Sequence, residues 1–84
     1  MNVVLVDDER LARAELARLL EDHNTVKIVG QAANAHEAKQ MVEEHQPDLL
    51  FLDIQMPEKN GFDLLEELDY VPEVIFTTAY DEYA

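Results

Sequence analysis

The sequence contains no cysteine, few basic residues and no long apolar run. Without cysteine, disulfide bonds and thiolate metal sites are excluded, and this usage fits a reducing compartment. Its apolar runs are far shorter than the roughly 20 residues that cross a membrane. The first residues predict a strand instead of a signal peptide. We therefore expect a soluble cytoplasmic protein that does not associate with membranes.

Basic residues are scarce relative to acidic ones. Six Lys and Arg stand against 19 Asp and Glu, which gives a formal net charge of −13. Direct binding to nucleic acid needs a basic surface, so this balance argues against it. A strongly acidic domain is suited instead to cations and to basic partner surfaces. The 84 residues, 48% of them hydrophobic, predict one globular domain.

Strand-like and helix-like segments alternate along the chain. Short apolar runs rich in β-branched residues predict strands at residues 3–6, 26–30, 49–53 and 74–77. The spacing of apolar residues predicts helices at residues 10–21, at 35–44, after Gly61 and, as a beginning, at 81–84. Such alternation predicts an α/β fold, in which right-handed crossovers place helices on both faces of a parallel sheet.

The apolar run at residues 49–52 leads directly into Asp53. Because apolar and polar residues do not alternate there, we expect a strand covered on both faces, which Pro57 prevents from pairing further. Open α/β sheets place their chemistry at the carboxyl ends of their strands, where Asp53 lies. Initiation of a turn also accounts for an Asp at this position. The interpretation of Asp53 therefore depends on the other acids.

A second acidic group, Asp7-Asp8-Glu9, follows the strand at residues 3–6. Acidic residues at the start of a helix interact favourably with its dipole, which accounts for Glu9. It accounts less well for Asp7 and Asp8 if a neighbouring strand brings Asp53 beside them, because close carboxylates repel by roughly 1 kcal/mol per pair even in water.

Other polar residues have structural interpretations. Asn34 and Glu37 predict a capping box, and Gly61 predicts a backbone conformation that other residues resist. The arginines of the first helix interleave with acids and are interpreted as surface charge: Arg10, Arg13 and Arg18. The histidines are interpreted as polar surface residues, with a metal or phosphorelay role as the alternative: His23, His36 and His45.

Three motifs occur in order along the chain. They are Val-Leu-Val-Asp-Asp-Glu at residues 4–9, Phe-Leu-Asp-Ile-Gln-Met-Pro at 51–57 followed by Gly61, and Phe-Thr-Thr-Ala-Tyr-Asp-Glu-Tyr-Ala at 76–84. Together they resemble the receiver domain of two-component response regulators, and the last resembles its LytTR-type branch of transcription regulators. The resemblance implies one receiver domain at residues 1–84, without the separate DNA-binding domain of that branch. It also implies a flavodoxin-like doubly wound parallel sheet with strand order 2-1-3-4.

The resemblance further implies a role for each residue of the site. Asp53 would accept a phosphoryl group from a sensor histidine kinase or a small phosphodonor. The Mg²⁺ ligands would be Asp7, Asp8, Asp53 and the backbone carbonyl of Gln55. Thr78 would contact the phosphoryl group and act in the switch. Tyr80 and Tyr83 follow that position, where they would contribute to an output surface or to ordinary packing.

The 84 residues also depart from the pattern of a whole receiver. A fifth strand with the Lys that ends it, the aromatic switch residue and the last helix are missing. Lys59 lies in a nearby loop, where we expect a structural role. The strand at residues 74–77 would then form an unpaired edge, and the first helix would be partly uncovered. We therefore expect either a truncated chain or a homodimer that covers these surfaces.

Two other functions remain open at this stage. The missing Lys is consistent with an inert pseudo-receiver or a dimerisation fragment. A Mg²⁺-dependent phosphohydrolase with Asp53 as nucleophile is the other alternative. Enzymes of the haloacid dehalogenase type carry a second Asp two residues after the nucleophile, however, and here that position is Gln55.

Overall fold

The computed structural model describes residues 1–77, and within them all the strands and helices expected from the sequence occur. In chain order they are β1 (Asn2–Val6), α1 (Arg10–Leu20), β2 (Lys27–Ala32), α2 (Ala35–His45), β3 (Leu49–Leu52), α3 (Gly61–Glu67) and β4 (Glu73–Phe76). No helix in this part of the chain is both long and apolar enough to cross a membrane. Four features expected from the sequence lie outside the described residues: the helix start at 81–84 and the residues Thr78, Tyr80 and Tyr83.

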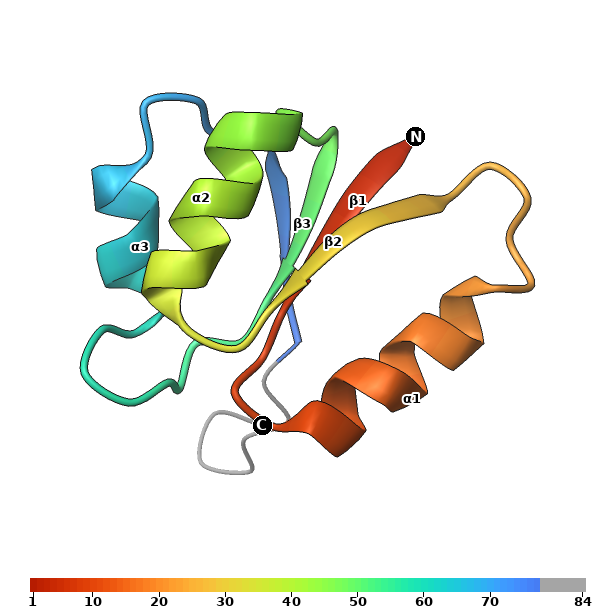
Figure 1. Ribbon diagram of the computed structural model, residues 1–84, viewed down its shortest axis with the longest axis horizontal. Coiled ribbons are helices and arrows are strands. Elements are labelled where there is room, and N and C mark those ends of the chain that lie inside the picture. Colours follow the sequence, from red (N-terminus) through yellow and green to blue (C-terminus); the bar gives the residue numbers. More distant parts are fainter. Residues whose placement is uncertain (78–84) are drawn as a thin grey trace.

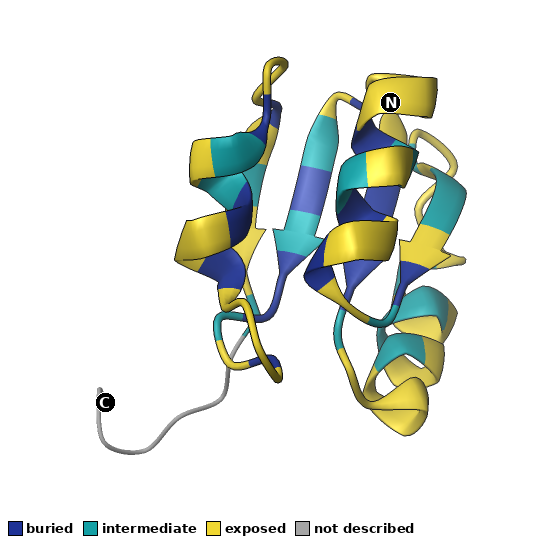
Figure 2. Ribbon diagram, turned by 60° about the vertical axis from the view of Figure 1, so that its left-hand side comes forward, coloured by how far each residue is buried: buried dark blue, intermediate teal, exposed yellow. Residues whose placement is uncertain are grey.

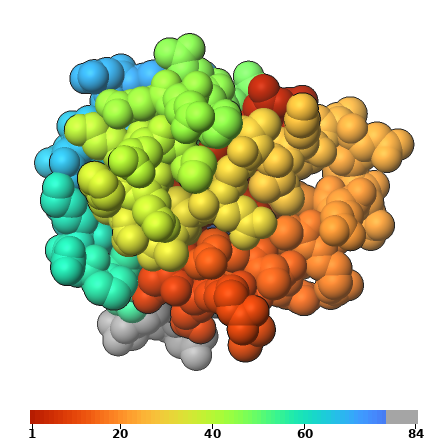
Figure 3. Space-filling view, in the orientation of Figure 1, coloured from red at the N-terminus to blue at the C-terminus, as the bar shows by residue number. Residues whose placement is uncertain are grey.

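The strands form one parallel sheet with the order β2-β1-β3-β4, as the resemblance implies. The crossover from β1 to β2 runs in one direction across the sheet, and the next two crossovers run in the other. Since such crossovers are right-handed, α1 lies on one face, and α2 and α3 lie together on the opposite face (Figure 1). The space-filling view likewise shows α1 and α2 over separate parts of the surface (Figure 3).

The main core lies between the sheet and the pair formed by α2 and α3. Its side chains are almost all aliphatic, among them Val4, Val6, Ala38, Val42, Leu50, Leu52 and Leu64. Figure 2 shows these buried positions on the inner sides of α2 and α3 and along the central strands. Alternate residues of β1 and β3 therefore fix which face of the sheet carries α2 and α3.

The face that carries α1 is covered less completely. None of the residues of α1 is buried, and Leu19 is 52% exposed. Leu49 and Phe51 of β3 are only partly buried. The expectation that β3 is covered on both faces is therefore wrong for one of them, which is covered only in part. A groove of about 260 Å³ runs between α1 and the sheet, lined by Leu5, Val6, Asp7, Ala12, Arg13, Glu15, Leu16, Leu19 and Thr77.

The helix caps follow the sequence with one difference. The side chain of Asn34 accepts a hydrogen bond from the Glu37 amide at 2.8 Å, as expected of the N-cap of α2. The carboxylate of Glu37, however, accepts from the amide of Ala33 instead of that of Asn34. The complete capping box belongs to α3, where Asn60 and Asp63 bond each other's amides at 2.9 and 3.0 Å.

Candidate functional site

The acidic residues of the site lie directly beyond the paired ends of β1 and β3. The amide of Asp53 donates to the carbonyl of Val6 at 2.9 Å, and the amide of Asp7 donates to the carbonyl of Ala32 at 3.1 Å. The hydrogen-bond ladder thus extends one residue past β1 and past β3. It fixes the backbones of Asp7 and Asp53 beside each other at the carboxyl edge of the sheet.

The structure brings together the carboxylates of Asp7, Asp8 and Asp53, as the strand order predicts. Oxygen atoms of the three side chains lie within 4.8 Å of one another. Within residues 1–77 no other group of three or more His, Asp or Glu side chains is arranged in this way. Asp53 is 8% exposed, Asp7 is partly buried and Asp8 is exposed, so the cluster opens toward solvent on the side of Asp8.

The electrostatics of the cluster are unfavourable without a cation. Burial raises the pKa of Asp7 above its usual value, and the negative charges of Asp53, Asp8 and Glu9 raise it further. The hydrogen bond from the Glu9 amide acts in the opposite direction. A divalent cation would reverse this balance by supplying the positive charge that the three carboxylates lack.

Each of the two less exposed carboxylates also closes a turn. The Glu9 amide donates to Oδ1 of Asp7 at 2.9 Å, and the Gln55 amide donates to Oδ1 of Asp53 at 3.1 Å. Both contacts are Asx turns, in which a side chain bonds the backbone two residues further on. The turn-forming interpretation of Asp53 is thus compatible with a functional one, because the turn holds its carboxylate in place.

Gly61 supports the backbone of Asp53 for a reason different from the one expected. Its φ angle is not positive, so no special backbone conformation is needed there. A Cβ atom at this position would lie 3.0 Å from the carbonyl oxygen of Asp53 and 3.2 Å from Cα of Ile54. The Gly61 amide also donates to the carbonyl of Ile54 at 2.9 Å. This close approach of the start of α3 to the loop after β3 favours glycine, because a larger residue would force its neighbours to move by a few tenths of an ångström.

Arg13 is a residue of this region whose role the sequence interpretation missed. Instead of forming surface charge, its Nη1 donates to the backbone carbonyl of Asp7 at 2.7 Å, and its side chain is partly buried. The signal was present in the spacing: Arg13 stands three residues before Leu16 and seven before Leu20, on the stripe that faces the sheet. Arg18, by contrast, forms an exposed ion pair with Glu15.

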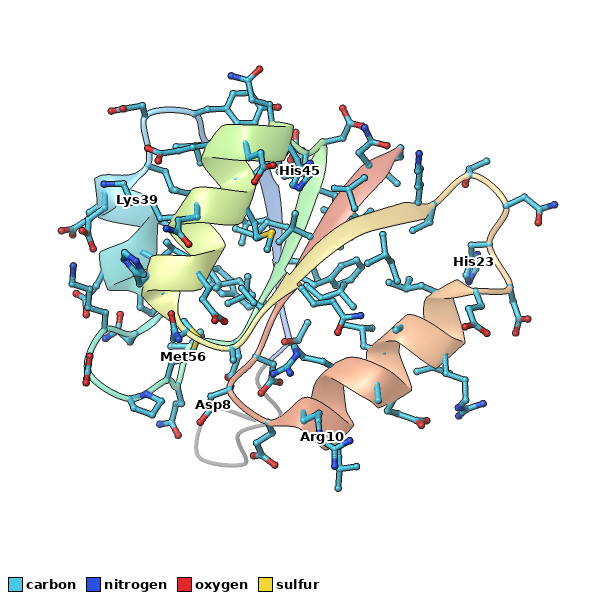
Figure 4. All side chains as sticks on the ribbon, in the orientation of Figure 1. Asp8, Arg10, His23, Lys39, His45 and Met56 are labelled. Atoms are coloured by element: carbon cyan, nitrogen blue, oxygen red, sulfur yellow. The ribbon has the colours of Figure 1, made fainter. Side chains whose placement is uncertain are left out.

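The other polar residues considered from the sequence lie elsewhere. Figure 4 shows Asp8 at the carboxyl ends of the strands between Met56 and Arg10, whereas His23 and His45 lie well away from it. Nζ of Lys59 bonds both carboxylate oxygens of Glu67 at 2.8 Å, which is the structural role expected of it.

Comparison with known proteins agrees with this arrangement. The sequence model of the response regulator receiver domain family matches residues 3–84. An uncharacterized response regulatory protein of Vibrio cholerae is 49% identical over 86 residues, and the sensory transduction protein LytT of Enterococcus faecalis is 46% identical over 87. Each match covers 100% of this chain and 36% of the relative, so the chain spans about a third of their length.

Among solved structures, the response regulator domain of Thermotoga maritima CheB is similar in fold, with a TM-score of 0.85 and 31% sequence identity. The similarity covers 94% of this chain and 60% of that one. The strand order, the carboxylates at the strand ends and the sequence matches agree with one another. The chain belongs to the response regulator receiver domain family of two-component systems.

Proposed function

We propose that this chain is a phosphorylation switch in which Asp53 accepts a phosphoryl group from a sensor histidine kinase in a Mg²⁺-dependent reaction. The observation that carries the proposal is the convergence of Asp7, Asp8 and Asp53 at the ends of adjacent strands, in a chain of the receiver family. The absence of cysteine fits a reducing compartment, and we assign the switch to the cytoplasm.

The donor set suits Mg²⁺. This ion prefers oxygen ligands, usually binds one or two carboxylates, and keeps several waters or substrate phosphate oxygens. Asp53 and Asp7 form the inner part of the cluster, while Asp8 lies at its solvent side. The backbone carbonyl of Gln55 is the fourth ligand that we propose. When bound, the ion would neutralise charge on the transferring phosphoryl group.

The space beside the cluster leaves room for a phosphodonor. Next to Asp8, the loop between β3 and α3 borders a pocket of about 590 Å³, lined by Asp8, Ile54, Gln55, Met56, Pro57, Asn60 and Phe62. A phosphorylated side chain of a partner could enter there from solvent.

In the reaction, a carboxylate oxygen of Asp53 attacks the phosphorus of the donor phosphohistidine. A phosphorus–oxygen bond forms while the phosphorus–nitrogen bond breaks, and the electron pair leaves with the imidazole, which takes up a proton. The product is an acyl phosphate on Asp53, a covalent carboxylate adduct of a kind that enzymes use elsewhere. We assign to Thr78 the hydroxyl that contacts the phosphoryl group and changes position in the switch.

The chemistry at Gln55 favours a switch over a phosphohydrolase. A hydrolase that uses Asp53 as nucleophile needs a nearby acid to protonate a poor leaving group. The amide side chain of Gln55, two residues after Asp53, has no such proton to give.

We further propose that phosphorylated Asp53 transmits a signal to transcription through an LytTR-type output domain in the whole protein.

We also propose that two copies of the chain associate as a homodimer. Within residues 1–77, β4 pairs only with β3, and Ile75 and Phe76 are among its exposed apolar side chains. An exposed apolar strand edge is a site for pairing with another chain. No residue of α1 is buried, so the face of the sheet that carries α1 is also covered incompletely, and a homodimer would cover both that face and the edge of β4.

Mass spectrometry of the intact 84-residue chain tests the phosphoacceptor. Incubation with Mg²⁺ and acetyl phosphate is expected to add one phosphate that is labile to hydroxylamine and maps to Asp53. The adduct should be absent with EDTA and from Asp53→Asn. Asp22→Asn, which changes an exposed acid in the loop after α1, is the matched control and should still be phosphorylated.

Each other outcome identifies an alternative function. Rapid multiple turnover of acetyl phosphate would support a phosphohydrolase. A folded chain that forms no adduct, even with phosphorylated kinase as donor, would support an inert dimerisation fragment. An adduct that persists in Asp53→Asn would overturn the assignment of Asp53.

A further inference from the structure

Arg13 links the first turns of α1 to the segment that carries Asp7 and Asp8. Its backbone amide donates to the carbonyl of Glu9 at 3.1 Å, and its Nη1 donates to the carbonyl of Asp7 at 2.7 Å. One residue therefore holds both ends of the segment 7–9. Asp8 lies between these two contacts, although it is itself exposed.

The position of Arg13 is unusual for a residue that serves only as surface charge. Its side chain is partly buried, and its Nε atom is buried without a hydrogen-bond partner among the described residues. Leaving a buried donor unsatisfied costs free energy, whereas a guanidinium on the surface of α1 would be hydrated. The contact with Asp7 is maintained at this cost.

Asp7 is held at three points, and Arg13 supplies the one that comes from α1. The other two are the bond from the Asp7 amide to Ala32 and the bond from the Glu9 amide to Oδ1 of Asp7. The first belongs to the sheet and the second to the local turn. Without Arg13, the segment 7–9 would lose its side-chain contact with the helix and gain freedom around Asp8.

We propose that Arg13 is a positioning residue for the cation site: its guanidinium holds the segment 7–9 so that the carboxylates of Asp7 and Asp8 face Asp53. The inference rests on the proposed function, because the cation is the Mg²⁺ of that site. Residues that orient metal ligands without touching the metal commonly change affinity 10–100-fold when replaced. A preorganised ligand set loses less conformational freedom when the ion binds.

Charge and positioning make opposite predictions for this residue. Arg13 is a cation close to an acidic cluster, so removing its charge alone would strengthen the binding of Mg²⁺. Removing a positioning contact would weaken it. The direction of the change therefore separates the two effects. Arg10, also on the first turn of α1 but exposed, allows the charge effect to be measured by itself.

Calorimetric titration of the 84-residue chain with Mg²⁺ at low ionic strength tests the proposal. Arg13→Met keeps most of the apolar stem and removes the charge and all donors, and we expect roughly tenfold weaker binding. Arg13→Lys keeps the charge and one donor group and is expected to recover part of the affinity. Arg10→Met, the matched control, should bind Mg²⁺ as tightly as the wild type or slightly more tightly.

Circular dichroism before each titration establishes that the variants are folded. An Arg13→Met affinity equal to or above that of wild type and Arg10→Met overturns the positioning role. If Arg13→Met does not fold, Arg13→Lys decides: weaker binding than wild type supports the role, and equal binding overturns it. A folded wild type that binds no Mg²⁺ overturns the metal site itself, so failure of the proposed function is distinguished from failure of this inference.

Discussion

Replacing Asp7 by Asn removes one charge from the acidic cluster while keeping the contact that shapes its turn. The Asn side chain retains an oxygen that can accept the hydrogen bond from the Glu9 amide, now at 2.9 Å. The backbone contacts of residue 7 with Ala32 and Arg13 are unaffected by the exchange. The variant therefore tests the repulsion among the carboxylates with little change in geometry.

The size of the effect follows from the separation of the charges. At 4.8 Å, the separation within which the three ligand oxygens lie, two unit charges repel by about 1 kcal/mol in the dielectric of water. Asp7 has two such neighbours, Asp8 and Asp53. Because Asp8 is exposed, salt would screen its charge, so the comparison is made at low ionic strength. At pH 7 and without divalent cations, we then expect Asp7→Asn to raise the free energy of unfolding by roughly 1–2 kcal/mol.

The pH dependence of this difference has a definite sign. Burial and neighbouring charges raise the pKa of Asp7 in the folded protein, so the folded state binds this proton more tightly than the unfolded state does. The cost of keeping Asp7 ionised in the folded state is fully present above the raised pKa. It shrinks as the pH falls through that value and disappears below the unfolded pKa of about 3.8. The advantage of Asp7→Asn should therefore vanish on acidification.

Urea unfolding followed by far-ultraviolet circular dichroism, with EDTA present, measures this difference. Asp22→Asn makes the same charge change in an exposed loop, and its effect should stay within about 0.5 kcal/mol. Saturating Mg²⁺ should then stabilise the wild type, by about 2.7 kcal/mol at 100 times the dissociation constant, and Asp7→Asn by less. Two results would refute this explanation: Asp7→Asn is no more stable than Asp22→Asn in EDTA, or Mg²⁺ stabilises the wild type and Asp7→Asn to the same extent.

Two further substitutions test the packing around the site and the uncovered face. Gly61→Ala should destabilise the chain by roughly 1–2 kcal/mol, because overpacking against backbone costs about 1–3 kcal/mol and the better helix propensity of Ala returns up to about 1. A Cβ at Gly30 comes close only to the flexible side chain of Met41, with His45 at an ordinary contact distance, so Gly30→Ala is the control and should change the free energy of unfolding little. An equally small change in Gly61→Ala would contradict this account. Leu19→Glu should shift the chain from dimer to monomer in analytical ultracentrifugation, whereas Leu11→Glu, on the same helix but outside the groove, should not. A wild type that sediments as a monomer at micromolar concentration would contradict the proposed dimer.

The sequence was sufficient for the parts of the fold that depend on periodicity. Apolar runs ending in acids placed the strand tips, and alternation with helices predicted the parallel sheet. The resemblance supplied the strand order, in which β1 and β3 are neighbours. With that order, the juxtaposition of Asp7 and Asp53 follows from geometry, since parallel strands end at the same edge of a sheet.

Contacts between distant elements were harder to predict because no periodicity records them. Gly61 was expected to need a special backbone conformation, yet what favours glycine there is the close approach of α3 to the carbonyl of Asp53. Arg13 was interpreted as surface charge because its neighbours alternate in sign. Its contact with the carbonyl of Asp7 depends on how α1 packs on β1, and composition does not reveal that packing.

The acidic site is ultimately a consequence of strand register. Val6 pairs with Leu52, so the residues that follow them, Asp7 and Asp53, leave the sheet side by side. A slip of one residue between β1 and β3 would exchange the two faces of one strand and move its buried leucines to the other side of the sheet. The core formed with α2 and α3 opposes such a slip, because Leu50 and Leu52 are fully buried there. The aliphatic residues that stabilise the fold therefore also hold oxygen atoms of three mutually repelling carboxylates within 4.8 Å of one another.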